Sequence, residues 1–181
     1  GERRAAGSCQ SIRAVEGFIY LGVVPMVKIK ILALGKIKEK YLRQGIDEYL
    51  KRLRPYAQVT VVEVEDLPIP EREEDCRRML QAEAEKLRPH LTGYKILLDI
   101  DGREVSSTEM AKELHDLVVR GNSQFTFVIG SSLGVDEDFK KEFDFRWSFG
   151  PLTFPHQLMR LMLLEQLYRT FRILSGEPYH K

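Results

Sequence analysis

Two short runs of apolar residues constrain the fold of this chain more than any other feature. Residues 27–34 read VKIKILAL, which alternates at first and then becomes wholly apolar, and residues 125–129 read FTFVI. A strand with one face in water alternates between apolar and polar residues, whereas a strand buried on both faces is apolar throughout. The two runs therefore predict inner strands of a sheet that is covered on both sides.

Further strands and helices are predicted to alternate along the chain. Residues 41–54 have apolar side chains at helical spacing, and Pro55 ends this helix because it cannot continue the hydrogen-bond ladder. Ser106 and Glu109 match a capping box that begins another helix. The other predicted helices cover residues 71–88, largely solvated, and 155–174, and the other strands cover residues 59–64, 95–100 and 145–149, with Asp101-Gly102 ending the third strand. This alternation predicts an α/β domain with a mostly parallel sheet and helices on both faces.

The composition fits one soluble domain without a metal or a membrane span. The 181 residues are 43% hydrophobic and 30% charged, and 28 basic against 27 acidic residues leave a net charge of +1. This near-neutral total argues against a mainly electrostatic nucleic-acid binder but does not exclude a small basic patch. The two cysteines have neither disulfide nor zinc spacing, and no apolar run reaches the roughly 18 residues of a membrane helix. We therefore expect a cytoplasmic protein without a metal site.

The first 25 residues differ from the remainder. Three arginines and a short apolar run over residues 18–25 superficially resemble a signal peptide, but the run contains Gly22 and lacks a cleavage site. We interpret residues 1–25 as a non-native leader, against a genuine extension or, less favoured, a targeting peptide. The domain would then span residues 26–181. The leader contains three arginines and two acids, so the domain without it has 25 basic and 25 acidic residues and no net charge.

Three of the predicted strands end in loops suited to a ligand. Ligands of parallel sheets bind beyond the carboxyl ends of the strands, where residues 98–102, 129–134 and 149–154 would meet. The loop 130–134 reads GSSLG, which is neither a dinucleotide fingerprint nor a P-loop and also fits a plain tight turn. Residues 149–156 read FGPLTFPH, an apolar and irregular stretch that suits an adenine-type ring. A buried connector is the alternative interpretation of that stretch.

The last helix and the tail offer a few chemically useful side chains. His156 lies at the predicted helix start, where the dipole favours a neutral imidazole that could be a base or a hydrogen-bond donor, although a lone histidine is more often structural. The helix is apolar nearly all round, so one face should meet the sheet and the remainder another subunit. The tail Tyr179-His180-Lys181 combines an aromatic ring, a titratable group and a cation, which an RNA-modifying site could use.

Several segments together resemble the ribosomal RNA large subunit methyltransferase H family. They are MVKIKILALGKIKEKY, LLDIDG, FVIGSSLG, SFGPLTFPHQLMRLMLLEQLYR and GEPYHK, and the similarity covers residues 26–181. The TFPH helix start combined with the YHK terminus is highly specific. The resemblance implies a SPOUT-class fold with a C-terminal trefoil knot, which periodicity alone does not reveal. It also implies a homodimer that uses S-adenosyl-L-methionine to methylate N3 of a pseudouridine in 23S rRNA of the assembled ribosome.

The resemblance further assigns residues to the site. The cofactor is expected to contact Leu98, Gly130, Phe149, Gly150, Pro151, Leu152, Thr153 and Phe154. The transfer site is expected to contain His156, Arg160, Tyr179 and His180, with the tail reaching toward the partner subunit. Many family members have glycine where this chain has Ser131, so the effect of this serine on cofactor affinity stays open.

The sequence leaves two other functions open, as well as the identity of the catalytic base. A knotted RNA-binding or ribosome-associated module without transferase activity would not bind S-adenosylmethionine. A SPOUT methyltransferase acting on tRNA would leave its methyl group on a different RNA. The N3 proton must be removed by a base, and either His156 or His180 could be that base.

Overall fold

Five parallel strands form one sheet in the order β2-β1-β4-β3-β5. The structure, a computed structural model, describes residues 26–178, so the predicted leader and the tail Tyr179–Lys181 lie outside the described residues. The strands are β1 (Val27–Leu34), β2 (Ala57–Val64), β3 (Tyr94–Glu104), β4 (Gln124–Ile129) and β5 (Phe145–Ser148). The helices are α1 (Lys40–Leu53), α2 (Glu73–Leu87), the 3₁₀ turn η1 (Arg88–His90), α3 (Ser107–Val119), α4 (Glu137–Lys140) and α5 (His156–Leu174).

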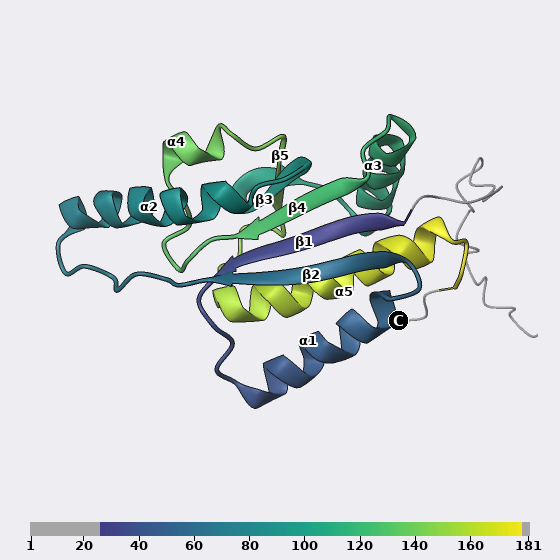
Figure 1. The fold of residues 1–181 in the computed structure, drawn as a ribbon, viewed down its shortest axis with the longest axis horizontal. Helices are drawn as coiled ribbons and strands as arrows, with labels where there is room; N and C mark the ends of the chain where they lie inside the picture. The colour runs from purple at the N-terminus through teal and green to yellow at the C-terminus, as the bar shows by residue number, and fades with distance from the viewer. Residues whose placement is uncertain (1–25, 179–181) are drawn as a thin grey trace, which may run out of the picture.

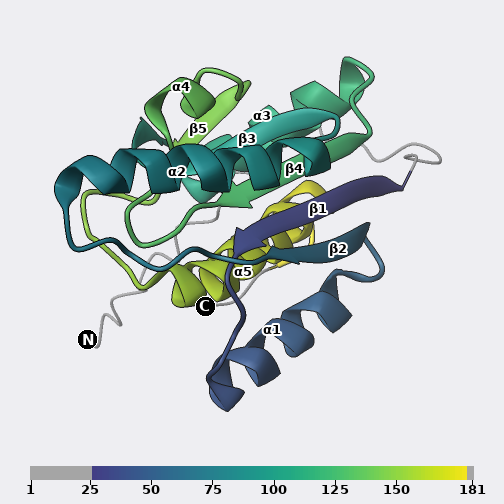
Figure 2. The ribbon, with the colours of Figure 1, turned by 60° about the vertical axis from the view of Figure 1, so that its left-hand side comes forward.

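Helices cover both faces of the sheet, as the apolar runs predict. Ile29, Ile31 and Ala33 of β1 belong to the core cluster shared with α1, α3 and α5. Leu32 and Leu34 belong to a second cluster, shared with α2 and α4. Figures 1 and 2 show α1 and α5 on one side of the sheet and α2 and α4 on the other. The wholly apolar end of β1 follows from this burial on two sides.

Helix α5 lies between the sheet, α1 and α3, which accounts for much of its apolar surface. Leu163, Leu164 and Leu167 are at most 1% exposed. Gly45 of α1 allows a close approach, because a Cβ there would lie 3.1 Å from both δ carbons of Leu161. These neighbours bury seven of the nineteen residues of α5, and the other twelve are only partly buried.

Strand β3 runs further than its sequence predicts. The turn pair Asp101-Gly102 was expected to end it, but the strand continues to Glu104. The pairing with β5 shifts register between Leu98 and Arg103, and the Asp99 carboxylate accepts a hydrogen bond from the Asp101 amide at 3.1 Å. The predicted end at Asp-Gly was therefore wrong, because the pair forms a bulge within the strand.

Two further helices differ from the sequence-based expectation. The charged helix α2 was predicted to be largely solvated; seven of its fifteen residues are exposed, while Ala84 and Leu87 pack against the sheet. Helix α4 was missed, because four residues are too few to show a helical period. No helix within residues 26–178 has the length and apolar character needed to cross a bilayer.

Candidate functional site

A cavity of about 400 Å³ lies at the carboxyl ends of β3, β4 and β5. Residues from all three loops predicted to form a crevice line it, so the structure confirms that these loops meet. Its volume falls in the range of small-molecule sites, roughly 300–1,000 Å³. Its position agrees with the rule for ligand sites in parallel sheets.

Most of the residues assigned to the cofactor line this one cavity. They are Leu98, Gly130, Phe149, Gly150, Leu152, Thr153 and Phe154. Pro151 is exposed and is not among the described residues that line the cavity. Of the four residues assigned to the transfer site, His156 lines the cavity as the first residue of α5. Tyr179 and His180 lie outside the described residues.

The loop after β4 is tight and depends on glycine. Ser131 and Gly134 form an isolated antiparallel bridge, and the Gly134 amide donates to the Ser131 carbonyl at 2.9 Å. A Cβ on Gly130 would lie 2.6 Å from the Gly134 carbonyl oxygen and 2.8 Å from Cγ1 of Val135. The Ser131 hydroxyl donates to the Gly134 carbonyl at 3.4 Å, within the same loop. Residue 130 therefore has no room for a side chain, whereas the side chain of Ser131 is accommodated.

Each of the three loops places one exposed apolar side chain at the cavity. Ile100 is 49% exposed, Leu133 44% and Leu152 68%, and all three line the cavity. Exposed apolar side chains that gather at one opening are typical of ligand and partner sites. The mouth of the cavity therefore suits an apolar ring better than a fully hydrated ligand.

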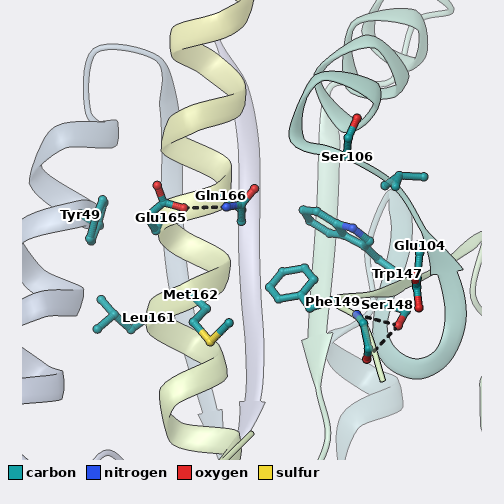
Figure 3. Close-up of a pocket in the computed structure, with 12 residues that line it drawn as sticks. Tyr49, Glu104, Ser106, Trp147, Ser148, Phe149, Leu161, Met162, Glu165 and Gln166 are labelled. Atoms are coloured by element: carbon teal, nitrogen blue, oxygen red, sulfur yellow. Dashed lines mark hydrogen bonds between the residues drawn. The ribbon is translucent and has the colours of Figure 1, made fainter. Parts of the chain in front are cut away.

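A second, larger cavity of about 700 Å³ shares one wall with the first. Trp147 and Phe149 line both, with their ring centroids 4.7 Å apart in an edge-on contact. Figure 3 shows Leu161, Met162, Glu165 and Gln166 of α5 on one side of this cavity and Trp147, Ser148 and Phe149 on the other. It lies between α5 and the ends of β3 and β5, and residues 130–134 do not line it. We therefore place the candidate ligand site in the smaller cavity at the strand ends.

A buried carboxylate that the sequence analysis did not single out joins the elements around the cavity. The side chain of Asp99 is 5% exposed, and its oxygens lie 3.6 Å from Nζ of Lys140 and 3.5 Å from a guanidinium nitrogen of Arg146. Burial lowers the pKa of Lys140, but the hydrogen bond with Glu137 and the charge of Asp99 raise it above its ordinary value. Asp99 thus connects β3 to α4 and β5 through charged contacts. The only sequence signal was its place in the LLDIDG segment.

Replacing Asp99 by asparagine should loosen the loops around the cavity. The side chain keeps its size but loses its charge, which leaves Lys140 and Arg146 without this partner. Because both ion pairs are long and Arg146 is half exposed, we expect a loss of about 1–2 kcal/mol in unfolding free energy. We also expect weaker binding of S-adenosylmethionine. Urea unfolding and calorimetric titration measure the two effects.

The matched control is Asp138→Asn, which removes an exposed carboxylate paired with Lys141 on the same short helix α4. This control should change neither quantity by more than about 0.5 kcal/mol. If Asp99→Asn behaved like Asp138→Asn, Asp99 would not organise the cavity.

Arg160 is buried and is not among the described residues that line the cavity. It is 2% exposed, and its guanidinium donates to Oε2 of Glu63 at 2.8 Å and to the Gly35 carbonyl at 3.1 Å. Burial raises the pKa of Glu63, but its hydrogen bond with Arg160, the charge of Arg160 and the Ile37 amide lower it below its ordinary value. Nε of Arg160 has no hydrogen-bond partner within the described chain. The geometry thus gives Arg160 contacts that fasten α5 to β2 and to the loop after β1.

Comparison with known proteins agrees with this architecture. The profile of a family described as "Predicted SPOUT methyltransferase" matches residues 27–180. The class of protein is therefore that of the SPOUT methyltransferases.

Individual relatives narrow the class. Ribosomal RNA large subunit methyltransferase H of Desulfitobacterium hafniense (strain Y51) is 49% identical over 160 residues, covering 86% of this chain and 100% of the relative. The protein of the same name from Enterococcus faecalis (strain ATCC 700802 / V583) is 49% identical over 161 residues, with the same coverage. A third, from Carboxydothermus hydrogenoformans, is 46% identical over 159 residues and is also covered in full. The chain belongs to the ribosomal RNA large subunit methyltransferase H family, as its sequence segments predict.

Proposed function

We propose that this protein is an S-adenosylmethionine-dependent methyltransferase that methylates N3 of a pseudouridine in 23S rRNA of the assembled ribosome. The observation that carries the proposal is that seven of the eight residues assigned to the cofactor line one cavity at the strand ends. Family membership supplies the class of reaction and the class of RNA.

The lining of the cavity fits this cofactor. Phe149, Leu152 and Phe154 supply apolar surface for an adenine ring, and Gly130 leaves its backbone open to close approach. Leu98 and Thr153 complete the residues that would hold it. When bound, S-adenosylmethionine supplies a methyl group attached to a sulfonium. The protein's own contribution is then mainly positioning, together with acceptance of the N3 proton.

The proposal includes a C-terminal trefoil knot. The strand order supports it, because the chain must return from β5 at the sheet edge to α5 under the central strands. On this return, residues 149–154 pass the loop 130–134, with which they share the cavity. Such a path is rare among protein folds.

A homodimer is also part of the proposal. Leu161 and Met162 of α5 are only partly buried and line the large second cavity, which a second subunit would cover. The tail with Tyr179 and His180 would then reach the cavity of the partner subunit. This arrangement would bring the two tail residues and His156 to one transfer site.

Removal of a histidine should slow methyl transfer without weakening the binding of the cofactor. We expect that His156→Ala or His180→Ala lowers the single-turnover rate by about 10²-fold or more, the usual contribution of a general base. The affinity for S-adenosylmethionine should change little, which calorimetric titration checks. An unchanged rate in both variants would exclude a histidine base.

Two measurements test the function itself. Calorimetric titration with S-adenosylmethionine separates an enzyme from an RNA-binding module without transferase activity, since the module would show no binding. Incubation with unmethylated ribosomes or with tRNA, followed by mass spectrometry of the nucleosides, then identifies the substrate. We expect N3-methylpseudouridine from the ribosomes alone. A methyl group found only on tRNA would overturn the rRNA assignment.

A further inference from the structure

The segment that joins β1 to α1, together with the first two residues of α1, has an unusual concentration of positive charge. Residues 36–41 read KIKEKY, with three lysines and one acid in a chain whose net charge is only +1. We call residues 36–41 the lysine loop. All three lysines are exposed, and their ammonium groups form no ion pair within residues 26–178. The loop thus presents charge that this part of the protein does not neutralise.

The backbone of the lysine loop is held firmly despite its exposed side chains. Ile37, between two exposed lysines, is 6% exposed and anchors the loop in the core. Its amide donates to Oε2 of Glu63 at 3.3 Å, and its carbonyl accepts from Arg43 at 2.7 Å. The same Glu63 oxygen is paired with the buried Arg160. The lysines therefore project from a fixed backbone, which reduces the entropy lost when they bind a partner.

The lysine loop lies beside the candidate site. The Lys38 amide donates to Oε1 of Gln157 at 3.5 Å, and the neighbouring residue, His156, lines the cavity. Figure 1 shows the connection from β1 to α1 passing the start of α5. A polymer bound along this loop would therefore extend to the mouth of the cavity.

The last residue of the loop is an exposed aromatic side chain. Tyr41, in the first turn of α1, is 66% exposed, which is unusual for so large a ring. Single-stranded RNA is bound by cations that contact its phosphates and by aromatic rings on which its bases stack. An acidic protein partner would use the lysines but would have no bases for the ring. The combination favours RNA.

We propose that the lysine loop is the surface that receives the RNA substrate, with Lys36, Lys38 and Lys40 on phosphates and Tyr41 stacked on an unpaired base. The inference rests on the proposed function for the identity of that RNA. It assigns a binding surface in addition to the cofactor cavity and the transfer site. It also explains how a nearly neutral protein binds a polyanion, since the charge is local.

The test compares two triple variants with equal loss of charge. Lys36→Gln/Lys38→Gln/Lys40→Gln removes the loop lysines, whereas Lys28→Gln/Lys51→Gln/Lys112→Gln removes exposed lysines of β1, α1 and α3. Binding to unmethylated 70S ribosomes and to protein-free 23S rRNA is measured as a function of salt. We expect the loop variant to bind both at least about tenfold more weakly near physiological salt, while the control variant matches the wild type.

The salt dependence gives a second, quantitative readout. Each phosphate contact contributes about −0.7 to −0.9 to the slope of log K against log salt. Loss of three contacts should therefore reduce the steepness of the slope by about 2 to 3. Tyr41→Ala should weaken binding by about fivefold or more without changing the slope, whereas Tyr41→Phe, which keeps the ring, should not weaken it. Calorimetric titration with S-adenosylmethionine should give wild-type affinity in all these variants.

Equal binding by the two triple variants, or an unchanged slope in the loop variant, would overturn the inference. If the wild type binds protein-free 23S rRNA, a loss seen with ribosomes but not with that RNA would also overturn it, because the loop would then contact a ribosomal protein. Failure of the wild type to transfer a methyl group, with loop-dependent RNA binding intact, would count against the proposed function and leave this surface standing.

Discussion

Replacement of Gly130 by alanine should weaken the binding of S-adenosylmethionine by about 10- to 100-fold. The added Cβ would lie 2.6 Å from the Gly134 carbonyl oxygen, so the loop after β4 must move. Overpacking of this kind costs about 1–3 kcal/mol, and restoring the original loop for the ligand would cost a similar amount. Each 1.4 kcal/mol is about a factor of ten in affinity. Calorimetric titration measures the affinity and urea unfolding the stability.

The matched control lies in the same loop. Gly134 has a φ of +83°, so alanine there is strained, but its Cβ would meet nothing within 4 Å. The strain should cost about 1–2 kcal/mol of stability without a clash next to the cavity. We expect Gly134→Ala to weaken cofactor binding clearly less than Gly130→Ala. Similar affinities for both variants would contradict the role given to the space around Gly130.

Replacement of Arg160 by methionine should destabilise the protein by about 2–4 kcal/mol. Removal of one partner from a buried ion pair usually costs about 3–5 kcal/mol, and we lower the value because Glu63 is partly exposed. The side chains of Arg160 and Glu63 are 3% and 39% exposed. The variant also loses the hydrogen bond to the Gly35 carbonyl, so the lysine loop should become less ordered. Denaturant unfolding measures the stability, and hydrogen exchange the loop.

The pH dependence of this variant has a definite sign. The folded protein lowers the pKa of Glu63 below its ordinary value of 4.5. The pair therefore stabilises the fold fully above that value, and the contribution is lost as the pH falls through the lower, folded pKa. The stability difference between the wild type and Arg160→Met should accordingly shrink below pH 4.5.

Arg160→Lys separates positioning from chemistry. Lysine keeps the charge but lacks the planar fork that reaches both Glu63 and the Gly35 carbonyl, so it should restore stability only in part. If methyl transfer fell in Arg160→Met with no change in unfolding free energy or loop exchange, Arg160 would act in the transfer site, as the family resemblance implies.

Patterns within short stretches of the sequence predicted strands and helix starts, because these depend mainly on residues close together in the chain. The apolar runs at residues 27–34 and 125–129 gave the inner strands, and the capping box at Ser106 gave the start of α3, where both reciprocal hydrogen bonds are present. The meeting of three loops followed from the rule for parallel strands.

Contacts between distant segments could not be predicted in this way. Asp99 is paired with Lys140 and Arg146, each more than forty positions away in the sequence. Arg160 is one of three arginines on an apolar helix. Their spacing in the sequence does not tell which of the three becomes buried when α5 packs against α1 and the sheet. The bulge at Asp101-Gly102 likewise depends on pairing with β5, which the residues of β3 do not encode by themselves.

The contact between α1 and α5 has a consequence for biosynthesis. Helix α1 precedes α5 in the chain, yet it packs at Gly45 against Leu161 of α5, so this contact can form only once α5 has been made. Strand β1 likewise cannot complete its pairing until β4 has been made, because this non-local pairing must first close a long loop. The nascent chain therefore exposes one apolar face of its sheet until the last helix emerges. The core therefore closes late in folding, and until then the uncovered apolar strands are exposed to aggregation.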